Sequence, residues 1–180
     1  MSTPHRAQSA NQNLSLSHNG RNHLMRREGV VAHYYNDDAN NCTYGVGTLA
    51  HLGPCTPAEL QTPVSNQDVV TNLNQGIDVA ANAVRQSVTN RHLTQEQFDA
   101  LVSFTYNVGA GGARNVLRQV NDGDLDRAVH TMQQFTHATV RGPNGQPQRD
   151  ANGHIITRVL PGLVHRRHEE GIPFRGQRRP

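Results

Sequence analysis

The segment from Asn66 to Val88 constrains the fold most, because its pattern fits only one kind of element. Its apolar residues recur at intervals of three and four, the spacing of one face of an α-helix. They are Val70, Leu73, Ile77, Ala81, Val84 and Val88. Ser65 precedes the pattern as a helix cap. Gly76 lies inside it and weakens a helix by about 1 kcal/mol relative to alanine. We therefore expect one long helix that is buried along one face.

The second half of the chain carries helical patterns separated by glycine-rich turns. A capping box of Thr94 and Gln97 begins one helix, whose Phe and Leu side chains we expect in the core. The run Gly109-Ala-Gly-Gly ends that helix. Further helices are predicted over Ala113 to Val120, over Leu125 to Phe135 behind a cap at Asp122 or Asp124, and over Leu160 to Gly171 with Pro161 in the first turn.

Two segments are expected to lie outside this helical core. Residues 1–18 are rich in Ser, Asn and Gln and predict a disordered segment. Residues 136–159 contain two Asn-Gly pairs, which favour turns. This second segment, inserted before the last helix, is expected either as a hairpin or long loop or as a disordered insertion.

The segment from Glu28 to Thr48 holds the residues with the most chemistry. A short helix, capped by Asn19 or Asn22, is predicted to end at Glu28 because Gly29 follows. Two extended runs come next, residues 30–35 and 43–49, separated by seven residues of which five are Asn or Asp. Such a turn predicts a hairpin joined directly to a helix end.

The two carboxylates of this segment stand in different surroundings. Glu28, in the last turn of a helix, faces the negative end of the helix dipole, which disfavours the charged form and favours a proton donor. Asp37, in a polar turn, is expected to stay ionised, and Thr43 could hold a water opposite it. Such a pair is typical of an acid and a base. The alternative is a solvated helix end in which Glu28 pairs with Arg26 or Arg27.

The spacing of these residues resembles the catalytic signature of the phage-type lysozymes, glycoside hydrolase family 24. The matching pattern is Glu28, eight residues, Asp37, five residues and Thr43, followed by Tyr-Gly-Val-Gly. The resemblance implies that Glu28 is the general acid and that Asp37 and Thr43 position the attacking water. Asp38 is the alternative to Asp37, and the spacing favours Asp37. Many members of the family have His where this chain has Thr48.

Two further segments match the family in the same order along the chain. Leu93 to Gly111 resembles a helix of the large lobe and implies that Asn107 contacts the sugar. Leu160 to Gly171 resembles the C-terminal segment and implies that Arg166 lies near the catalytic glutamate. The resemblance implies an α+β, predominantly helical, lysozyme-like fold with two lobes in a catalytic domain over residues 19–180. The small β-hairpin lobe would span residues 29–64, the linking helix residues 65–88, and the large lobe residues 89–176 plus the N-terminal helix.

The resemblance also implies a reaction. The family's substrate is the β-1,4 bond between N-acetylmuramic acid and N-acetylglucosamine in peptidoglycan, and no cofactor or metal is expected. The chain would be a monomer acting as an endolysin or as a secreted antibacterial effector, the latter with an immunity protein as a partner. The alternative is a non-catalytic module that binds peptidoglycan in a phage tail or a secretion apparatus.

The charge of the chain bears on its binding partners, and its cysteine content bears on the compartment in which it acts. All 17 basic residues are arginine, the formal net charge is +3 and the pI is about 9.3. Because the arginines are scattered rather than clustered in a stripe, nucleic-acid binding is not expected. No zinc-ligand spacing is present in the sequence. Cys42 and Cys55 are expected either as a disulfide, which suits an oxidising compartment, or as two thiols.

The first twenty residues lack the apolar core of a signal peptide. The sequence also contains no apolar run long enough to span a membrane. We therefore expect synthesis in the cytoplasm. Action in the periplasm or cell wall would then depend on a holin or a secretion system.

Overall fold

The structure is a computed structural model, and it describes residues 10–29, 31–37, 39–142 and 145–176. The chain divides into two compact units. The first, the helical unit, comprises residues 1–20, 77–133 and 167–180; the second, the sheet unit, comprises residues 21–76 and 134–166. Three helices continue from one unit into the other. None of the helices in the described ranges has the length and apolar character that crossing a membrane requires.

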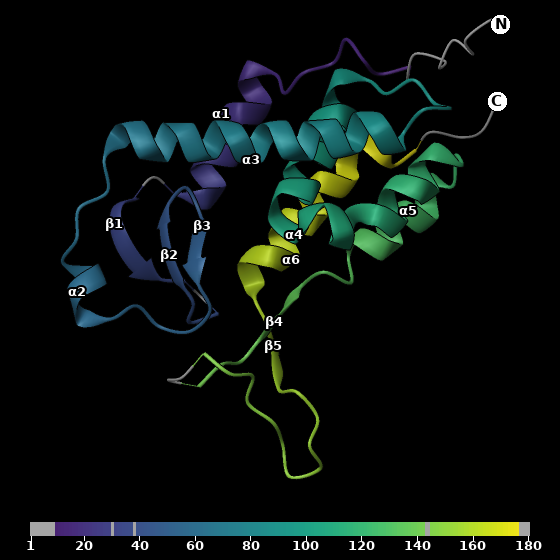
Figure 1. Ribbon diagram of the computed structural model, residues 1–180. Helices are drawn as coiled ribbons and strands as arrows, with labels where there is room; N and C mark the ends of the chain where they lie inside the picture. The colour runs from purple at the N-terminus through teal and green to yellow at the C-terminus, as the bar shows by residue number, and fades with distance from the viewer. Residues whose placement is uncertain (1–9, 30, 38, 143–144, 177–180) are drawn as a thin grey trace, which may run out of the picture. The chain divides into compact units, whose positions relative to one another are not determined.

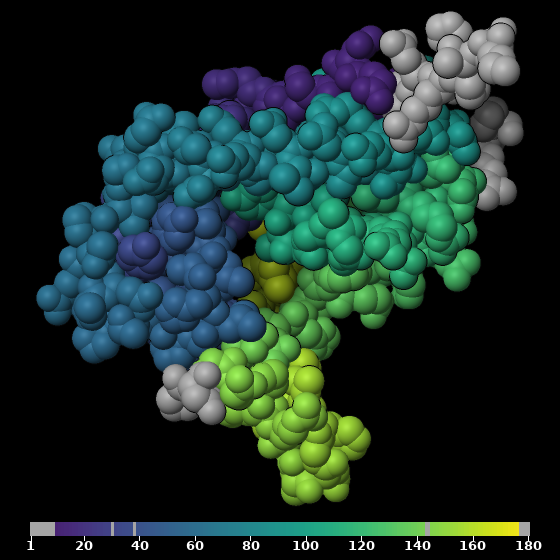
Figure 2. All heavy atoms as spheres, viewed as in Figure 1, coloured from purple at the N-terminus to yellow at the C-terminus, as the bar shows by residue number. Residues whose placement is uncertain are grey.

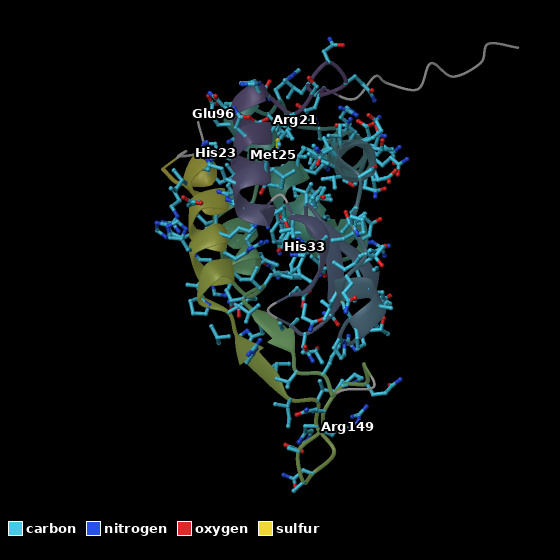
Figure 3. The ribbon with its side chains drawn as sticks, turned by 90° about the vertical axis from the view of Figure 1, so that its left-hand side faces the viewer. Arg21, His23, Met25, His33, Glu96 and Arg149 are labelled. Carbon is cyan, nitrogen blue, oxygen red and sulfur yellow. A yellow bond between two sulfur atoms is a disulfide. The ribbon has the colours of Figure 1, made fainter. Side chains whose placement is uncertain are left out.

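The sheet unit is built on one three-stranded antiparallel sheet. Helix α1 (His18–Glu28) leads through Gly29 into β1 (Val31–Asn36), and Figure 3 shows labelled residues of both, Met25 on α1 and His33 on β1. Strands β2 (Cys42–Gly45) and β3 (Thr48–His51) complete the order β1-β2-β3 (Figure 1). The predicted second strand is divided in two, because Gly45 and Gly47 both adopt positive φ and turn the chain.

The loop after β3 is held close to the sheet. Helix α2 (Pro57–Leu60) begins with a capping box in which Thr56 and Glu59 satisfy each other's backbone N–H groups. A disulfide joins Cys42 of β2 to Cys55, just before this helix. Of the two alternatives for the cysteines, the structure therefore has the disulfide.

The long helix α3 (Asn66–Ser87) forms where the periodicity predicts it. Its buried face carries Leu73, Ile77 and Val84, which are at most 6% exposed. The prediction was wrong for the first residue of the apolar stripe. Val69 is 3% exposed and belongs to the buried face, whereas the predicted Val70 is 45% exposed. The two valines are adjacent, and the spacing alone did not fix which of them begins the stripe.

The helical unit is centred on α4 (Gln95–Asn121). Gly109 interrupts this helix with φ 75° and ψ 160°, so it consists of two helices joined at a kink, as the glycine run predicts. Phe98, Leu101 and Phe104 are fully buried in the first half. The unit is completed by α5 (Leu125–Met132), the end of α6 (Pro161–Gly171) and a 3-10 helix, η1 (Ile172–Phe174). Helix α5 ends three residues earlier than predicted, and Asp124 makes no side-chain capping bond.

The insertion, residues 136–159, is a hairpin rather than a disordered segment. Strands β4 (His137–Thr139) and β5 (Thr157–Val159) pair antiparallel. Beyond them the chain forms two separate turns, one closed by a bridge between Arg141 and Pro147 and the other by a bridge between Arg149 and Ile155. Figure 2 shows the light-green far end of the insertion standing clear of the sheet, and Figure 3 places Arg149 there. In the turn between Arg141 and Pro147, a Cβ added at Gly145 would lie 2.6 Å from the Leu52 carbonyl oxygen, so the insertion touches the loop after β3.

The N-terminal segment is more ordered than predicted from residue 10 onward. Asn11 is 1% exposed; its amide nitrogen donates to the carbonyls of Val88 and Arg91, and its oxygen accepts from the N–H of Leu93. The predicted caps Asn19 and Asn22 lie inside α1, and Ser17 takes that role by accepting from the Gly20 N–H. Residues 1–9 of this segment, like the four residues at the C-terminus, lie outside the described ranges.

Candidate functional site

Glu28 is the last residue of α1, where the helix ends as the sequence predicts. The Gly29 N–H donates to the Met25 carbonyl, and Gly29 adopts φ 66°, a left-handed helix end. The Glu28 side chain is 12% exposed, so it is not a solvated helix end. Its oxygen Oε1 accepts a hydrogen bond of 2.5 Å from Nη1 of Arg166, whose side chain is 7% exposed. The structure thus places Glu28 and Arg166 in direct contact within the sheet unit.

Gly47 shapes the space beside the other oxygen of Glu28. A Cβ added at Gly47 would lie 2.5 Å from Oε2, closer than Cβ atoms approach other atoms in proteins. Gly47 also adopts φ 73°, which favours glycine. The turn between β2 and β3 therefore reaches the carboxylate only because residue 47 has no side chain.

Asp37 closes the turn between β1 and β2. Its oxygen Oδ1 accepts from the backbone N–H groups of Ala39 and Asn41, each at 2.8 Å. Hydrogen bonds to backbone N–H groups stabilise a charged carboxylate and fix its orientation. Because Oδ1 accepts these two backbone hydrogen bonds, Oδ2 is the oxygen that can bind a water or accept a proton.

Thr43 supplies a hydroxyl next to that second oxygen. Its Oγ1 lies 3.5 Å from Oδ2 of Asp37 and donates to the Asn41 carbonyl at 3.3 Å. A distance of 3.5 Å is at the long end of direct hydrogen bonding and suits two groups that bind the same water. Thr43 is 3% exposed, which fixes the position of its hydroxyl.

Asn41 and the disulfide hold this turn in place. The Asn41 amide nitrogen lies 3.5 Å from Oδ2 of Asp37, and its oxygen accepts from the Gly53 N–H at 3.2 Å. The Cys42 N–H donates to the Gly53 carbonyl at 2.7 Å. Cys42 is also bonded to Cys55, whose N–H donates to the Asn36 side-chain oxygen at 2.7 Å. The loop after β3 is therefore fixed to residues on both sides of Asp37.

Asn107 belongs to the helical unit, in the last turn of α4 before the kink at Gly109. It is exposed, and its oxygen Oδ1 accepts a hydrogen bond of 2.6 Å from Nη2 of Arg167. Arg167, adjacent to Arg166 in α6, is 1% exposed.

The structure brings together Glu28 with Arg166, and Asp37 with Thr43, all in the sheet unit. The alternative base, Asp38, lies outside the described residues. Sequence reasoning missed Asn41, Gly47 and Arg167. The Asn-rich turn and the repeated glycines of the hairpin were signals for the first two. Nothing in the sequence separates Arg167 from its neighbour Arg166.

One group of side chains in the described ranges has the composition of a metal site, namely Cys42, His51 and Glu59. Its sulfur is already bonded to Cys55, which removes it as a thiolate ligand. His51 and Glu59 interact directly instead, with Nε2 3.1 Å from Oε1.

Sequence comparison relates the chain to lytic proteins of bacteriophages. A family model described as phage lysozyme matches residues 25–170. The endolysin of Bacillus phage PZA is 29% identical over 164 residues, which cover 89% of this chain and 55% of that protein. The SAR-endolysin of Haemophilus phage HP1 (strain HP1c1) is 24% identical over 147 residues, 82% of this chain and 74% of that protein. The chain thus spans about half the length of the Bacillus phage endolysins that it matches.

Comparison with solved structures also finds muramidases and endolysins. The muramidase domain of SpmX from Asticaccaulis excentricus is 28% identical with a TM-score of 0.64, covering 91% of this chain and 99% of that one. The endolysin from Escherichia coli O157:H7 phage FAHEc1 has a TM-score of 0.67 at 24% identity, covering 93% and 98%. The predicted α+β, predominantly helical fold class is confirmed.

Proposed function

Because the chain belongs to the phage lysozyme family, we propose that it is a peptidoglycan muramidase. It would hydrolyse the β-1,4 bond between N-acetylmuramic acid and N-acetylglucosamine. The observation that carries the proposal is the pairing of Asp37 with Thr43, where one carboxylate oxygen is occupied by backbone N–H groups and the other faces a buried hydroxyl at 3.5 Å. This arrangement suits a water that is held and activated from one side.

Glu28 is the proposed general acid. It donates its proton to the glycosidic oxygen as the bond from that oxygen to the anomeric carbon breaks. The carboxylate that remains lies against Arg166, whose guanidinium stabilises the new negative charge. Burial of the pair strengthens this interaction, because little water screens it.

Asp37 is the proposed base. The water between Oδ2 and Thr43 attacks the anomeric carbon, its oxygen forms the new bond, and one of its protons passes to Asp37. In this mechanism the configuration at the anomeric carbon is inverted. The carboxyl groups of Glu28 and Asp37 should then lie about 6.5 to 9.5 Å apart, because a water must fit between the base and the sugar. Asn107 is the proposed contact to the glycan in the helical unit.

Product analysis tests the proposal. Purified peptidoglycan is digested, the new reducing ends are reduced with borohydride, and the fragments are identified by mass spectrometry. A muramidase leaves reduced N-acetylmuramic acid at the ends, whereas a glucosaminidase leaves reduced N-acetylglucosamine. If the chain sediments with peptidoglycan but releases no fragments, it is a binding module and the enzymatic proposal fails.

The identity of the base has its own test. Asp37→Asn should reduce turnover by several orders of magnitude, whereas Asp38→Asn should retain most of the activity. Equal losses in the two variants would mean that the water is not held by Asp37.

The proposed site of action is the bacterial cell wall. A phage endolysin and an antibacterial effector would use the same chemistry and differ in delivery. A holin gene next to this one would indicate lysis at the end of a phage cycle. A neighbouring gene whose product binds this chain and blocks the reaction would indicate an effector with an immunity protein.

A further inference from the structure

The hydrogen bond between Arg167 and Asn107 determines which end of the Asn107 amide points outward. A guanidinium carries only donors, so the atom that faces it must be the amide oxygen. The 2.6 Å contact from Nη2 therefore fixes Oδ1 on the side of Arg167. Because the amide group is planar, its nitrogen and both hydrogens are turned away from the arginine. Asn107 is exposed, so these two donors are available to a ligand.

Arg167 itself is held from several directions inside the helical unit. Its guanidinium carbon lies 4.9 Å from the centre of the Phe104 ring, a cation–π contact. Its Nη1 lies 3.2 Å from Oε2 of Glu170, and both side chains are 1% exposed. Ser103 donates to the other oxygen of Glu170 at 2.6 Å. A charge buried among such partners has little freedom to move, so it provides a fixed support for the amide.

We propose that Arg167 is a positioning residue that makes Asn107 a hydrogen-bond donor to the glycan. The assignment of a glycan as the ligand rests on the proposed muramidase function. The group recognised would be an acceptor oxygen, and the acetamido carbonyl that every sugar of the strand carries is suited to two N–H donors. An unsupported asparagine would rotate, and would present its oxygen to the same group about as often as its nitrogen.

The first experiment removes the donor and keeps the support. In Asn107→Asp the carboxylate still accepts from Arg167, but no N–H points outward. With soluble, uncrosslinked glycan strands as substrate, KM should rise about three- to tenfold, the value of one neutral hydrogen bond, with little change in kcat. Asn74→Asp is the matched control, because Asn74 of α3 is an exposed asparagine whose oxygen Oδ1 also accepts from an arginine, Nη2 of Arg21 at 2.6 Å, and KM should be unchanged. An unchanged KM in Asn107→Asp would contradict a donor role.

The second experiment removes the support and keeps the asparagine. Arg167→Met alone would leave Glu170 buried without its partner, so it is combined with Glu170→Gln, which still accepts from Ser103. KM should again rise about three- to tenfold, and adding Asn107→Ala to this background should change it less than twofold. If Asn107→Ala has its full effect in both backgrounds, Arg167 does not position the amide.

A third readout does not depend on catalysis. The two side-chain N–H resonances of Asn107 should be separate and rigid in the unmodified chain. In the Arg167→Met/Glu170→Gln variant they should show faster motion, while the circular dichroism and thermal transition confirm that the chain is folded. Unchanged amide dynamics would overturn the positioning role. If the dynamics change as expected while peptidoglycan is not cleaved, the muramidase proposal fails and the positioning role stands.

Discussion

Arg166 donates from Nη1 to Oε1 of Glu28 at 2.5 Å, and the two side chains are 7% and 12% exposed. The two residues are 138 positions apart in the sequence, at the end of α1 and within α6. A contact of this kind joins the proposed acid to the part of the chain that follows the insertion. Its loss should therefore affect both stability and activity.

Replacing Arg166 tests that contact. Arg166→Met leaves the Glu28 carboxylate largely buried without a cation, which should lower the free energy of unfolding by about 3 kcal/mol. Urea denaturation measures this loss, and peptidoglycan turnover should fall with it. Arg158→Met, which removes an exposed arginine of the same sheet unit, should change neither quantity. Equal stability of the two variants would show that the ion pair is not formed in solution.

Gly47 gives a second test of the surroundings of Glu28. In Gly47→Ala the methyl group meets Oε2 at 2.5 Å and displaces the carboxylate, so turnover should fall at least tenfold. Gly153→Ala is the matched control, because Gly153 has a similar φ of 82° but no atom within 4 Å of an added Cβ. Both variants should lose about 1 kcal/mol of stability, because alanine is strained at a positive φ. Only Gly47→Ala should lose activity. Equal turnover in the two would contradict the contact between Gly47 and Glu28.

Reduction of the disulfide should loosen the turn that carries Asp37. Cys42 and Cys55 are separated by 13 positions. A disulfide that closes a loop of this length raises the free energy of unfolding by about 3 kcal/mol. Urea denaturation with and without a thiol-free reductant should show a difference of this size. The double variant Cys42→Ser/Cys55→Ser should match the reduced chain and not respond to reductant. No difference on reduction would indicate that the loop is held by its hydrogen bonds alone.

The contact between His51 and Glu59 predicts a dependence on pH. The backbone carbonyl of Leu52, and then Glu59, raise the pKa of His51, so its contribution to stability is present below pH 6.5 and is lost as pH rises through the raised value. Hydrogen bonds from Thr56, and then from His51, lower the pKa of Glu59 to about 2. Its contribution is present above pH 4.5 and is lost as pH falls towards 2.

NMR titration of the His51 ring checks this contact. In Glu59→Gln the pKa of His51 should fall relative to the unmodified chain, because one of the two groups that raise it no longer carries a negative charge. A His51 titration that is identical with and without Glu59 would contradict the contact.

Local patterns predicted most of the secondary structure. The spacing of apolar residues gave α3 almost to the residue, Thr94 and Gln97 began α4, and Gly109 interrupted it. These features depend on neighbours in the sequence, so periodicity and capping chemistry are sufficient to find them. Where two candidates were adjacent, as with Val69 and Val70, the pattern could not choose between them, because only packing decides which is buried.

Contacts between segments far apart in the sequence could be predicted less well. Asn11 resembled any polar residue of a flexible segment, yet its amide satisfies backbone groups near residue 90. Arg166 was indicated by family resemblance alone. The support of Asn107 by Arg167 combines residues from two helices that no local pattern connects. Even at the candidate site, the role of Gly47 depends on the distance to a carboxylate 19 positions earlier, which the sequence does not contain.

The most direct measurement is the turbidity loss of permeabilised Gram-negative cells with Glu28→Gln. This variant keeps the shape of the side chain and cannot donate an acidic proton, so lysis should be abolished while the thermal transition shows that the chain is folded. Glu96→Gln, which changes an exposed glutamate in the first turn of α4, should lyse cells at the unmodified rate. Substantial lysis by Glu28→Gln would contradict the assignment of the general acid.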